Sequence, residues 1–230
     1  MRTPFSSADS KSIREMFTGV APRYDLANQI LSFGLDRIWR KRVCEQVALW
    51  KPKQILDVAT GSGVLAHELE KTNPGATVTG ADFCAAMLKV AQKRSLTRLV
   101  VADGLMLPFA DAAFDVVTVA FGLRNMASLE RALAESARVL RPGGHVLILD
   151  FSLPTAPLLP AYRLYLHFML PRVAGWLTGQ ADAYKYLADS IERFPRGQAM
   201  IALLGQAGFR DGAVRPFSGG IVTAYWAERR

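Results

Sequence analysis

The stretch QILDVATGSG, residues 54–63, decides the fold of this 230-residue chain. Its first half is apolar and predicts a buried strand, and Gly61 and Gly63 predict a tight turn directly after it. From Val64 onward the apolar residues recur at helical spacing. Small residues at such a turn let a ligand approach the backbone, and the helix start offers free N–H groups. The stretch therefore predicts a ligand-binding strand-turn-helix unit.

A second predicted strand, residues 76–81, ends at Asp82, about 20 residues after the turn. A carboxylate in this position accepts hydrogen bonds from both hydroxyls of an adenosine ribose. The pattern therefore predicts a cofactor that contains adenosine. Because Gly61-x-Gly63-x-x-Ala66 satisfies the relaxed dinucleotide fingerprint, a nicotinamide or flavin cofactor remains an alternative.

Several neighbouring residues favour S-adenosyl-L-methionine instead. Asp57 lies just before the turn, where a carboxylate can hold the ammonium end of that cofactor. Asp103 ends a third predicted strand and can accept from the adenine amino group, and residues 114–120 form a fourth strand. A cofactor without a pyrophosphate needs acidic and apolar contacts rather than a phosphate cradle, and these residues supply them.

Alternating strands and helices predict an α/β fold with a Rossmann-like, mostly parallel sheet. We expect one domain over the whole chain, with an antiparallel closing strand, N-terminal helices and a helical cap insertion. Its parts are an N-terminal helical segment (1–50), a cofactor-binding βα core (53–152), a cap for the substrate (153–195), and a final helix with closing strands (196–230).

Individual boundaries follow from turn residues and apolar periodicity. Helices are expected within 11–50, with breaks at Pro22 and 32–34, and an apolar, proline-punctuated stretch at 158–177 is expected to line a greasy substrate. Arg141-Pro142-Gly143-Gly144 predicts a helix stop and a tight turn before a strand at 145–151. The chain should close with a helix at 196–208 and strands at 209–217 and 221–227.

The cysteine and histidine content gives no metal signature. Cys44 and Cys84 lie far apart with no CxxC pair, which favours a reducing compartment. His67 and His145 are expected to be structural, whereas His167 lies in the cap stretch and is a candidate proton relay. No metal is expected.

The formal net charge of +8 indicates either an anionic partner, such as nucleic acid or a membrane surface, or a contribution to solubility alone. Arginine-rich runs with interleaved aromatic residues are absent, so nucleic acid is not expected. A basic cluster at residues 37–42 is interpreted as a solvated helix face, with contact to an anionic membrane surface as the alternative. No uncharged run reaches 18 residues, and no apolar secretory signal is present. We expect a cytoplasmic protein, peripheral at the inner membrane face, and leave monomer and homodimer open.

Residues 121–125, Phe-Gly-Leu-Arg-Asn, follow the fourth strand at the sheet edge where ligands of open α/β sheets bind. Arg124 and Asn125 together offer a fan of donors and one acceptor, which suits an oxygen-bearing ring. A loop salt bridge is the alternative interpretation.

The chain resembles the ubiquinone/menaquinone biosynthesis C-methyltransferase family (UbiE type), a group of class I methyltransferases. The most specific matching segments are FTGVAPRYD (17–25), AFGLRN (120–125) and ADAYKYLADSI (181–191). Less specific matches include LSFGLDRIW (31–39), LDVATGSG (56–63), ADGLMLPF (102–109) and RVLRPGG (138–144).

The resemblance implies S-adenosyl-L-methionine as cofactor and places functions on residues. Those expected at the cofactor are Tyr24, Thr60, Gly61, Gly63, Asp82, Asp103 and Gly104. Those expected at the reaction are Arg124 and Asn125, with Tyr184 and Tyr186 on the substrate side. The implied reaction is methylation of a ring carbon of a prenylated demethylquinol, giving menaquinol, a ubiquinol precursor, or both.

The chemistry fits these residue types. An oxidised quinone ring is electron-poor, so the substrate should be the quinol, and removal of a hydroxyl proton pushes electron density onto the neighbouring carbon. Arg124 is expected to stabilise the developing phenolate, directly or through a water, because a guanidinium is a poor base. Ala120 and Tyr225 depart from the family pattern, where a small hydroxyl residue and a histidine are common. Alternatives are methylation of another lipophilic phenol or polyketide, a nicotinamide-dependent oxidoreductase, and a non-catalytic member of a quinone-synthesis assembly.

Overall fold

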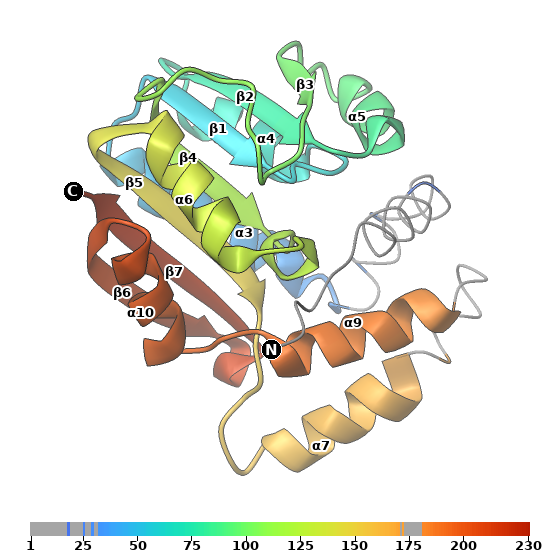
Figure 1. Ribbon diagram of the computed structural model, residues 1–230. Coiled ribbons are helices and arrows are strands. Elements are labelled where there is room, and N and C mark those ends of the chain that lie inside the picture. The colour runs from blue at the N-terminus through green and yellow to red at the C-terminus, as the bar shows by residue number, and fades with distance from the viewer. Residues whose placement is uncertain (1–17, 19–24, 26–28, 30–31, 171, 173–180) are drawn as a thin grey trace.

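The structure is a computed structural model that describes residues 18, 25, 29, 32–170, 172 and 181–230. Its centre is a seven-stranded sheet in the order β3-β2-β1-β4-β5-β7-β6 (Figure 1). β7 is antiparallel to both of its neighbours, β5 and β6, and the other pairings are parallel. The expected α/β sheet with one closing antiparallel strand is therefore confirmed. The strands are β1 Gln54–Val58, β2 Thr77–Asp82, β3 Leu99–Val101, β4 Phe114–Ala120, β5 Leu140–Phe151, β6 Phe209–Phe217 and β7 Val222–Arg229.

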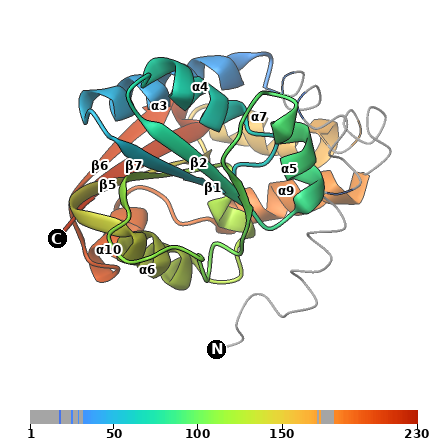
Figure 2. The same ribbon diagram turned by 90° about the horizontal axis from the view of Figure 1, so that it is seen from above.

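Helices cover both faces of this sheet, as Figure 2 shows from above. α3 (Leu35–Leu49) and α4 (Val64–Thr72) pack on one face, and α6 (Leu129–Val139) and α10 (Gln198–Gln206) pack on the other. Successive residues of β5 point to opposite faces, so Val146 and Ile148 join the core under α6 while Leu147 and Leu149 join the core under α3. α5 (Ala85–Gln92) follows β2.

The cap lies beyond the carboxyl ends of the parallel strands (Figure 1). It contains α7 (Leu159–Leu164), which continues as the π-helix η3 (Tyr165–Met169), and α9 (Ala181–Arg193). A separate small apolar core joins these elements to the end of β5 through Leu153, Leu166 and Ile191. Two short 3₁₀ helices, η2 (Leu123–Asn125) and η4 (Ser218–Gly220), complete the described elements.

One predicted boundary is wrong. Residues 141–144 were expected to form a helix stop and a tight turn before a strand at 145–151, but β5 begins at Leu140, which pairs with Phe114. The register then shifts between Phe114 and Val116, so the glycines are absorbed in an irregularity within the strand. Close packing requires glycine at position 144, because a Cβ there would lie 2.9 Å from the carbonyl oxygens of Arg141 and Asp115.

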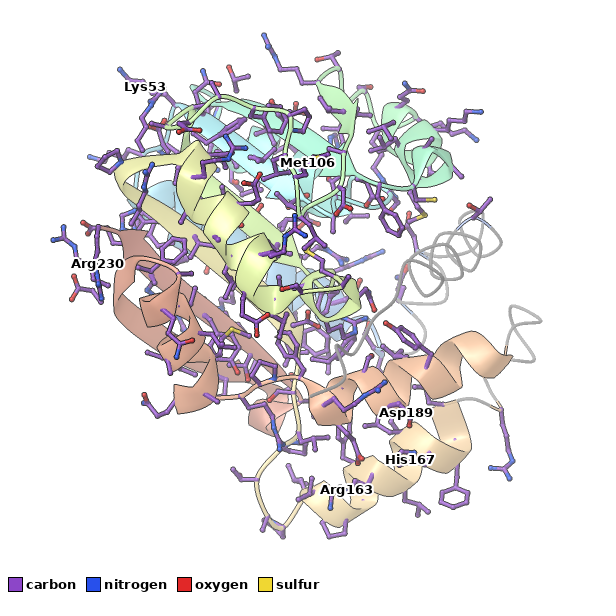
Figure 3. The ribbon with its side chains drawn as sticks, viewed as in Figure 1. Lys53, Met106, Arg163, His167, Asp189 and Arg230 are labelled. Atoms are coloured by element: carbon purple, nitrogen blue, oxygen red, sulfur yellow. The ribbon has the colours of Figure 1, made fainter. Side chains whose placement is uncertain are left out.

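Arg141 of this segment holds the end of the sheet that is remote from the cap. Arg141 donates to Oδ1 of Asp115 at 2.6 Å, and Oδ2 of Asp115 accepts from the backbone N–H groups of Lys53 and Gln54 at 2.8 Å. Figure 3 shows Lys53 far from the cap residues Arg163 and His167. Arg141 therefore stabilises the starts of strands rather than a ligand site.

The structure describes only part of the N-terminal segment in which helices were expected. α3 confirms a helix within 11–50 after the break at 32–34, and the segment before residue 32 lies mostly outside the described residues. In the described part of the chain, no helix combines the length and apolar character that crossing a membrane requires.

Candidate active site

The glycine turn connects β1 to α4 at the carboxyl edge of the sheet. Gly61 and Gly63 have φ values of 58° and 76°, which side-chain-bearing residues rarely adopt. A Cβ on Gly63 would lie 2.4 Å from Cδ1 of Leu96 and 2.8 Å from Cβ of Ala91. Both backbone conformation and close packing therefore require glycine at this position.

Asp57 is a buried carboxylate beneath the turn. Its Oδ2 accepts from the Thr60 hydroxyl and its Oδ1 accepts from the Thr118 hydroxyl, both at 2.6 Å. Burial raises the pKa of Asp57 to about 6, although the hydrogen bonds from the two hydroxyl groups lower it. Asp57 therefore ties β1, the turn and β4 together.

Asp82 holds the turn from the second strand. Its Oδ2 accepts from the N–H of Gly61 and its Oδ1 from the N–H of Cys84, each at 2.8 Å. Burial raises its pKa, while these two backbone donors lower it. A carboxylate can accept about four hydrogen bonds. Each oxygen of Asp82 thus has capacity for one further donor, as two ribose hydroxyls would require.

Asp103 and Gly104 follow β3 along the same edge. Oδ1 of Asp103 accepts from the N–H of Leu105 at 2.9 Å, so the carboxylate fixes its own turn. A Cβ on Gly104 would lie 2.9 Å from Cε of Met126, which explains the glycine. Asp103 itself is exposed and its second oxygen can accept a ligand donor.

A cavity of about 360 Å³ opens beside the glycine turn. Its walls carry both signs of charge close together, which suits a ligand end that bears both an ammonium and a carboxylate. The charged residues in the walls are Asp25, Asp36, Asp57, Glu68, Arg37, Arg40 and Arg94. The basic cluster at 37–42 is thus divided: Arg40 pairs with Asp36, Arg42 pairs with Glu45 at 2.9 Å, and Arg37 lines the cavity.

Two residues that border this edge have left-handed backbone conformations. Ala59 follows β1 with φ 54°, and Phe121 follows β4 with φ 57°. Gly122 is required next to them, because a Cβ there would lie 2.4 Å from Cβ of Ala59. Such conformations cost about 1–3 kcal/mol and cluster at functional sites.

Arg124 stands in η2 between the sheet and the cap. Its Nη1 donates to Oδ1 of Asp150 and, at 2.7 Å, to the carbonyl oxygen of Phe121. Its guanidinium carbon also lies 5.2 Å from the ring centre of Phe151. Asn125 makes one long contact, 3.5 Å from Nδ2 to the carbonyl oxygen of Phe121, so its amide is weakly held.

Of the residues proposed on the substrate side, the structure describes the side chains of His167 and Tyr186. His167 is exposed, and its Nε2 lies 3.4 Å from Glu192, which also accepts from Arg163 at 3.2 Å (Figure 3). Tyr186 lies on α9 and is partly buried. Tyr184 belongs to the same helix, but its side chain lies outside the described residues, as does all of Tyr24.

The expected cofactor residues of the turn and of β2 come together, and Arg124 lies at the same edge. Sequence reasoning missed three groups: Thr118 beneath Asp57, Asp150 beside Arg124, and Asp25. Asp25 accepts from the Ser62 hydroxyl and from Arg94, so it ties the N-terminal segment to the turn. Asp150 ends a strand at this edge, and the rule used for Asp82 could have found it.

The sequence of this chain is similar to those of known methyltransferases. The model of the ubiE/COQ5 methyltransferase family matches residues 5–229. A protein of Thermus thermophilus named demethylmenaquinone methyltransferase is 46% identical over 200 residues, covering 84% of this chain and 91% of its own. A protein of Syntrophotalea carbinolica named ubiquinone/menaquinone biosynthesis C-methyltransferase UbiE is 43% identical over 218 residues, covering 92% of each.

Solved structures share the fold at much lower identity. A SAM-dependent methyltransferase from Thermotoga maritima, described as a possible histamine N-methyltransferase, matches with a TM-score of 0.67 at 16% identity, over 94% of this chain and 99% of its own. Human N-acetylserotonin methyltransferase in complex with SAM matches with a TM-score of 0.61 at 19% identity, over 94% of this chain and 59% of its own.

Proposed function

The chain belongs to the ubiE/COQ5 methyltransferase family, and from that membership we propose that it methylates a ring carbon of a reduced, prenylated quinol. It is an S-adenosyl-L-methionine-dependent methyltransferase. Its relatives carry the names of enzymes that methylate demethylmenaquinone or act in ubiquinone and menaquinone biosynthesis. Both a naphthoquinol and a benzoquinol precursor are therefore candidate substrates.

The residues present fit the cofactor. When bound, it supplies a methyl group on a positively charged sulfur. We assign the ribose hydroxyls to Asp82, whose two oxygens each have capacity for one more donor. The adenine amino group is assigned to Asp103, and the amino-acid end to the cavity of mixed charge beside Thr60, Gly61 and Gly63.

The substrate is assigned to the space between the sheet edge and the cap. The observation that carries this assignment is Arg124, a buried guanidinium at the carboxyl end of the sheet, near the apolar core of the cap, against which Phe151, Tyr162 and Leu187 pack partly buried. A fixed positive charge next to apolar and aromatic side chains suits a ring oxygen that acquires negative charge. Asn125 is assigned to orient the ring, because its amide is weakly held.

Tyr184, Tyr186 and His167 remain the proposed substrate-side residues of the cap. The contact between His167 and Glu192 favours a role in joining η3 to α9 over a role in proton transfer. Replacing His167 by Gln should leave kcat within a few-fold of the parent if that is its role.

We propose further that the cap contacts the membrane surface from the cytoplasmic side. The outer side of α7 and η3 exposes Leu158, Leu164, Phe168 and Met169, each by more than half. Arg163 and Arg172 lie among them, and large exposed apolar groups beside basic ones are typical of interfacial helices. A prenylated quinol resides in the membrane, so this face would bring the site to its substrate. Binding to lipid vesicles measures the contact.

A second candidate is methylation of another lipophilic phenol, because Arg124 and the apolar residues of the cap beside it would serve such a ring as well. The test is label transfer from methyl-labelled S-adenosyl-L-methionine to a demethylnaphthoquinol, to a demethylated methoxybenzoquinol, and to simple alkylphenols, with oxidised quinones as controls. We expect label in a quinol and none in the oxidised controls. Label only in alkylphenols, or none anywhere while S-adenosylhomocysteine still binds, would contradict the quinol assignment.

A further inference from the structure

Arg124 and Asp150 form an ion pair at the carboxyl end of the sheet. The arginine side chain is 6% exposed and the aspartate side chain is 0% exposed. Moving a carboxylate out of water costs several kcal/mol, which a single contact offsets only in part. A pair buried this deeply in a site of reaction is therefore expected to serve more than stability.

The hydrogen bonds from the Arg124 side chain and from the N–H of Phe151 reach one oxygen of the aspartate, and the backbone N–H of Arg124 also acts on the carboxylate and lowers its pKa. Oδ1 accepts from Nη1 of Arg124 and from the N–H of Phe151, the latter at 2.8 Å. Oδ2 of Asp150 and Nε of Arg124 are buried, and neither has a hydrogen-bond partner among the residues that the structure describes. Leaving such an atom unmatched costs about 1–3 kcal/mol. A donor from outside the chain is therefore expected at Oδ2.

Among the residues that the structure describes, one charged group, Arg124, acts on the pKa of Asp150. The cap contributes Tyr162, on whose phenol the charge of Arg124 acts, and β7 contributes Thr223, which lies opposite Asp150 in the register. Burial raises the pKa of Asp150, although Arg124 and the N–H of Phe151 lower it. Burial also raises the pKa of Tyr162, so this phenol stays neutral at physiological pH.

We propose that Asp150 accepts the proton released by the hydroxyl of the substrate, with Arg124 holding the carboxylate and stabilising the oxygen left behind. The inference rests on the proposed function and names the group that the quinol mechanism needs. A guanidinium stays protonated and cannot take this proton itself. Asp57 and Asp82 are engaged with the glycine turn and the cofactor side.

The O–H bond of the quinol breaks, its electron pair stays on oxygen, and the proton moves to Oδ2 of Asp150 directly or across one water. The neighbouring ring carbon then forms a bond to the methyl carbon, and the pair of the broken C–S bond stays with sulfur. The ring hydrogen on that carbon leaves to solvent as a proton, and the oxygen takes its own proton back from Asp150.

Proton uptake by Asp150 also changes the field at the substrate. While the aspartate is ionised, its charge offsets that of Arg124. Once it is protonated, the positive charge of Arg124 acts on the phenolate in a site shielded from water, where electrostatic interactions are strong. The same proton transfer therefore creates the phenolate and stabilises it.

The test compares kcat as a function of pH for the parent chain, Asp150→Asn and Asp150→Glu, with a demethylnaphthoquinol. In the parent, kcat should fall toward acid pH as Asp150 becomes protonated. Asp150→Asn should lower kcat by roughly 10²- to 10⁴-fold, the usual contribution of a positioned base. Its residual rate should rise about tenfold per pH unit, because the hydroxyl must then ionise unaided. Thr223→Val, opposite Asp150, is the matched control and should keep the parent profile.

Affinity for S-adenosylhomocysteine shows whether each variant is folded. A drop in kcat of Asp150→Asn by the same factor at every pH, or a kcat within threefold of the parent, would overturn the inference. If Asp150→Asn does not bind S-adenosylhomocysteine, Asp150→Glu decides: its acid limb should move to a different pH, and a limb at the parent position overturns the inference. A parent chain inert toward every quinol would instead refute the proposed function.

Discussion

Asp82 and Asp57 lie at the ends of adjacent strands, yet different contacts hold them. Asp82 is fixed by two backbone N–H groups and keeps capacity for ligand donors, whereas Asp57 is enclosed by two threonine hydroxyls. Replacement of the first should therefore affect cofactor binding, and replacement of the second should affect the pH dependence of stability.

Asp82→Asn should weaken binding of S-adenosylhomocysteine by roughly 10- to 100-fold, since a hydrogen bond to a charged group contributes about 1.5–3 kcal/mol. Isothermal titration calorimetry measures the change. Asp111→Asn is the control, because Asp111 is an exposed carboxylate that pairs with Arg138 away from the cofactor edge. Equal affinities for the Asp82→Asn variant and the parent would remove Asp82 from the site.

Asp57 should make the free energy of unfolding depend on pH. Its folded-state pKa of about 6 exceeds the unfolded value of about 3.9, so the folded chain holds the proton more tightly. This contribution is complete below about pH 4 and is lost as pH rises through about 6. Relative to Asp57→Asn, the parent should thus gain about 2 kcal/mol of stability as pH falls from 7 to 4. Urea unfolding at several pH values tests this, and a constant difference between the two proteins would contradict it.

At this scale the sequence located Asp57, Asp82 and Arg124 because each lies near the carboxyl end of a recognisable strand. It did not locate the contact between Arg124 and Asp150, because the two residues are far apart in the chain and meet only when β4 and β5 pair. The tie between Asp25 and Ser62 of the turn was missed because these two residues are also far apart in the chain.

Among the elements, the turn between β1 and α4 gives the sharpest test of packing. Gly63 and Gly143 have nearly the same φ, 76° and 77°, but only Gly63 is crowded by Leu96 and Ala91. Gly143→Ala should cost about 1 kcal/mol, from the left-handed conformation alone. Gly63→Ala should cost about 2–4 kcal/mol, because a methyl group must also be forced into a packed core.

Thermal unfolding of the two alanine variants measures the difference, and equal melting temperatures would show that crowding at the turn is relieved at no cost. Cofactor affinity should fall only in Gly63→Ala, since Gly143 lies at the remote end of the sheet.

The elements themselves were largely predictable, because apolar residues alternate or recur with the period of their structure. β4 was expected at 114–120 and lies at Phe114–Ala120. The start of β5 was missed because proline and two glycines usually stop a strand, and only pairing with Phe114 extends it to Leu140. Nothing in the local sequence of the cap predicts that α7 continues as a π-helix.

At the scale of the whole molecule, a net charge of +8 and an apolar cap surface combine. Binding to vesicles with anionic lipid should weaken as salt rises, and Phe168→Asp with Met169→Asp should lower it by roughly tenfold or more. Leu49→Asp is the matched control, since Leu49 is exposed on α3 at a distance from the cap. Cosedimentation with vesicles measures binding, and an equal loss in the control would refute a specific role of the cap.

A further question at the scale of the whole molecule is which atom of the substrate receives the methyl group. Structures with this fold include enzymes that their names describe as N- and O-methyltransferases, so the fold alone does not decide. The cap and the pair of Arg124 with Asp150 favour a ring made nucleophilic at carbon by loss of a hydroxyl proton.

The most direct test is the ¹³C NMR spectrum of the product formed from a reduced demethylnaphthoquinol and S-adenosyl-L-methionine labelled with ¹³C in its methyl group. We predict one labelled signal in the region of a methyl group on an aromatic ring carbon, and none when the acceptor is oxidised. A labelled signal in the methoxy region would contradict carbon methylation, and with it the account of Arg124 and Asp150 given above.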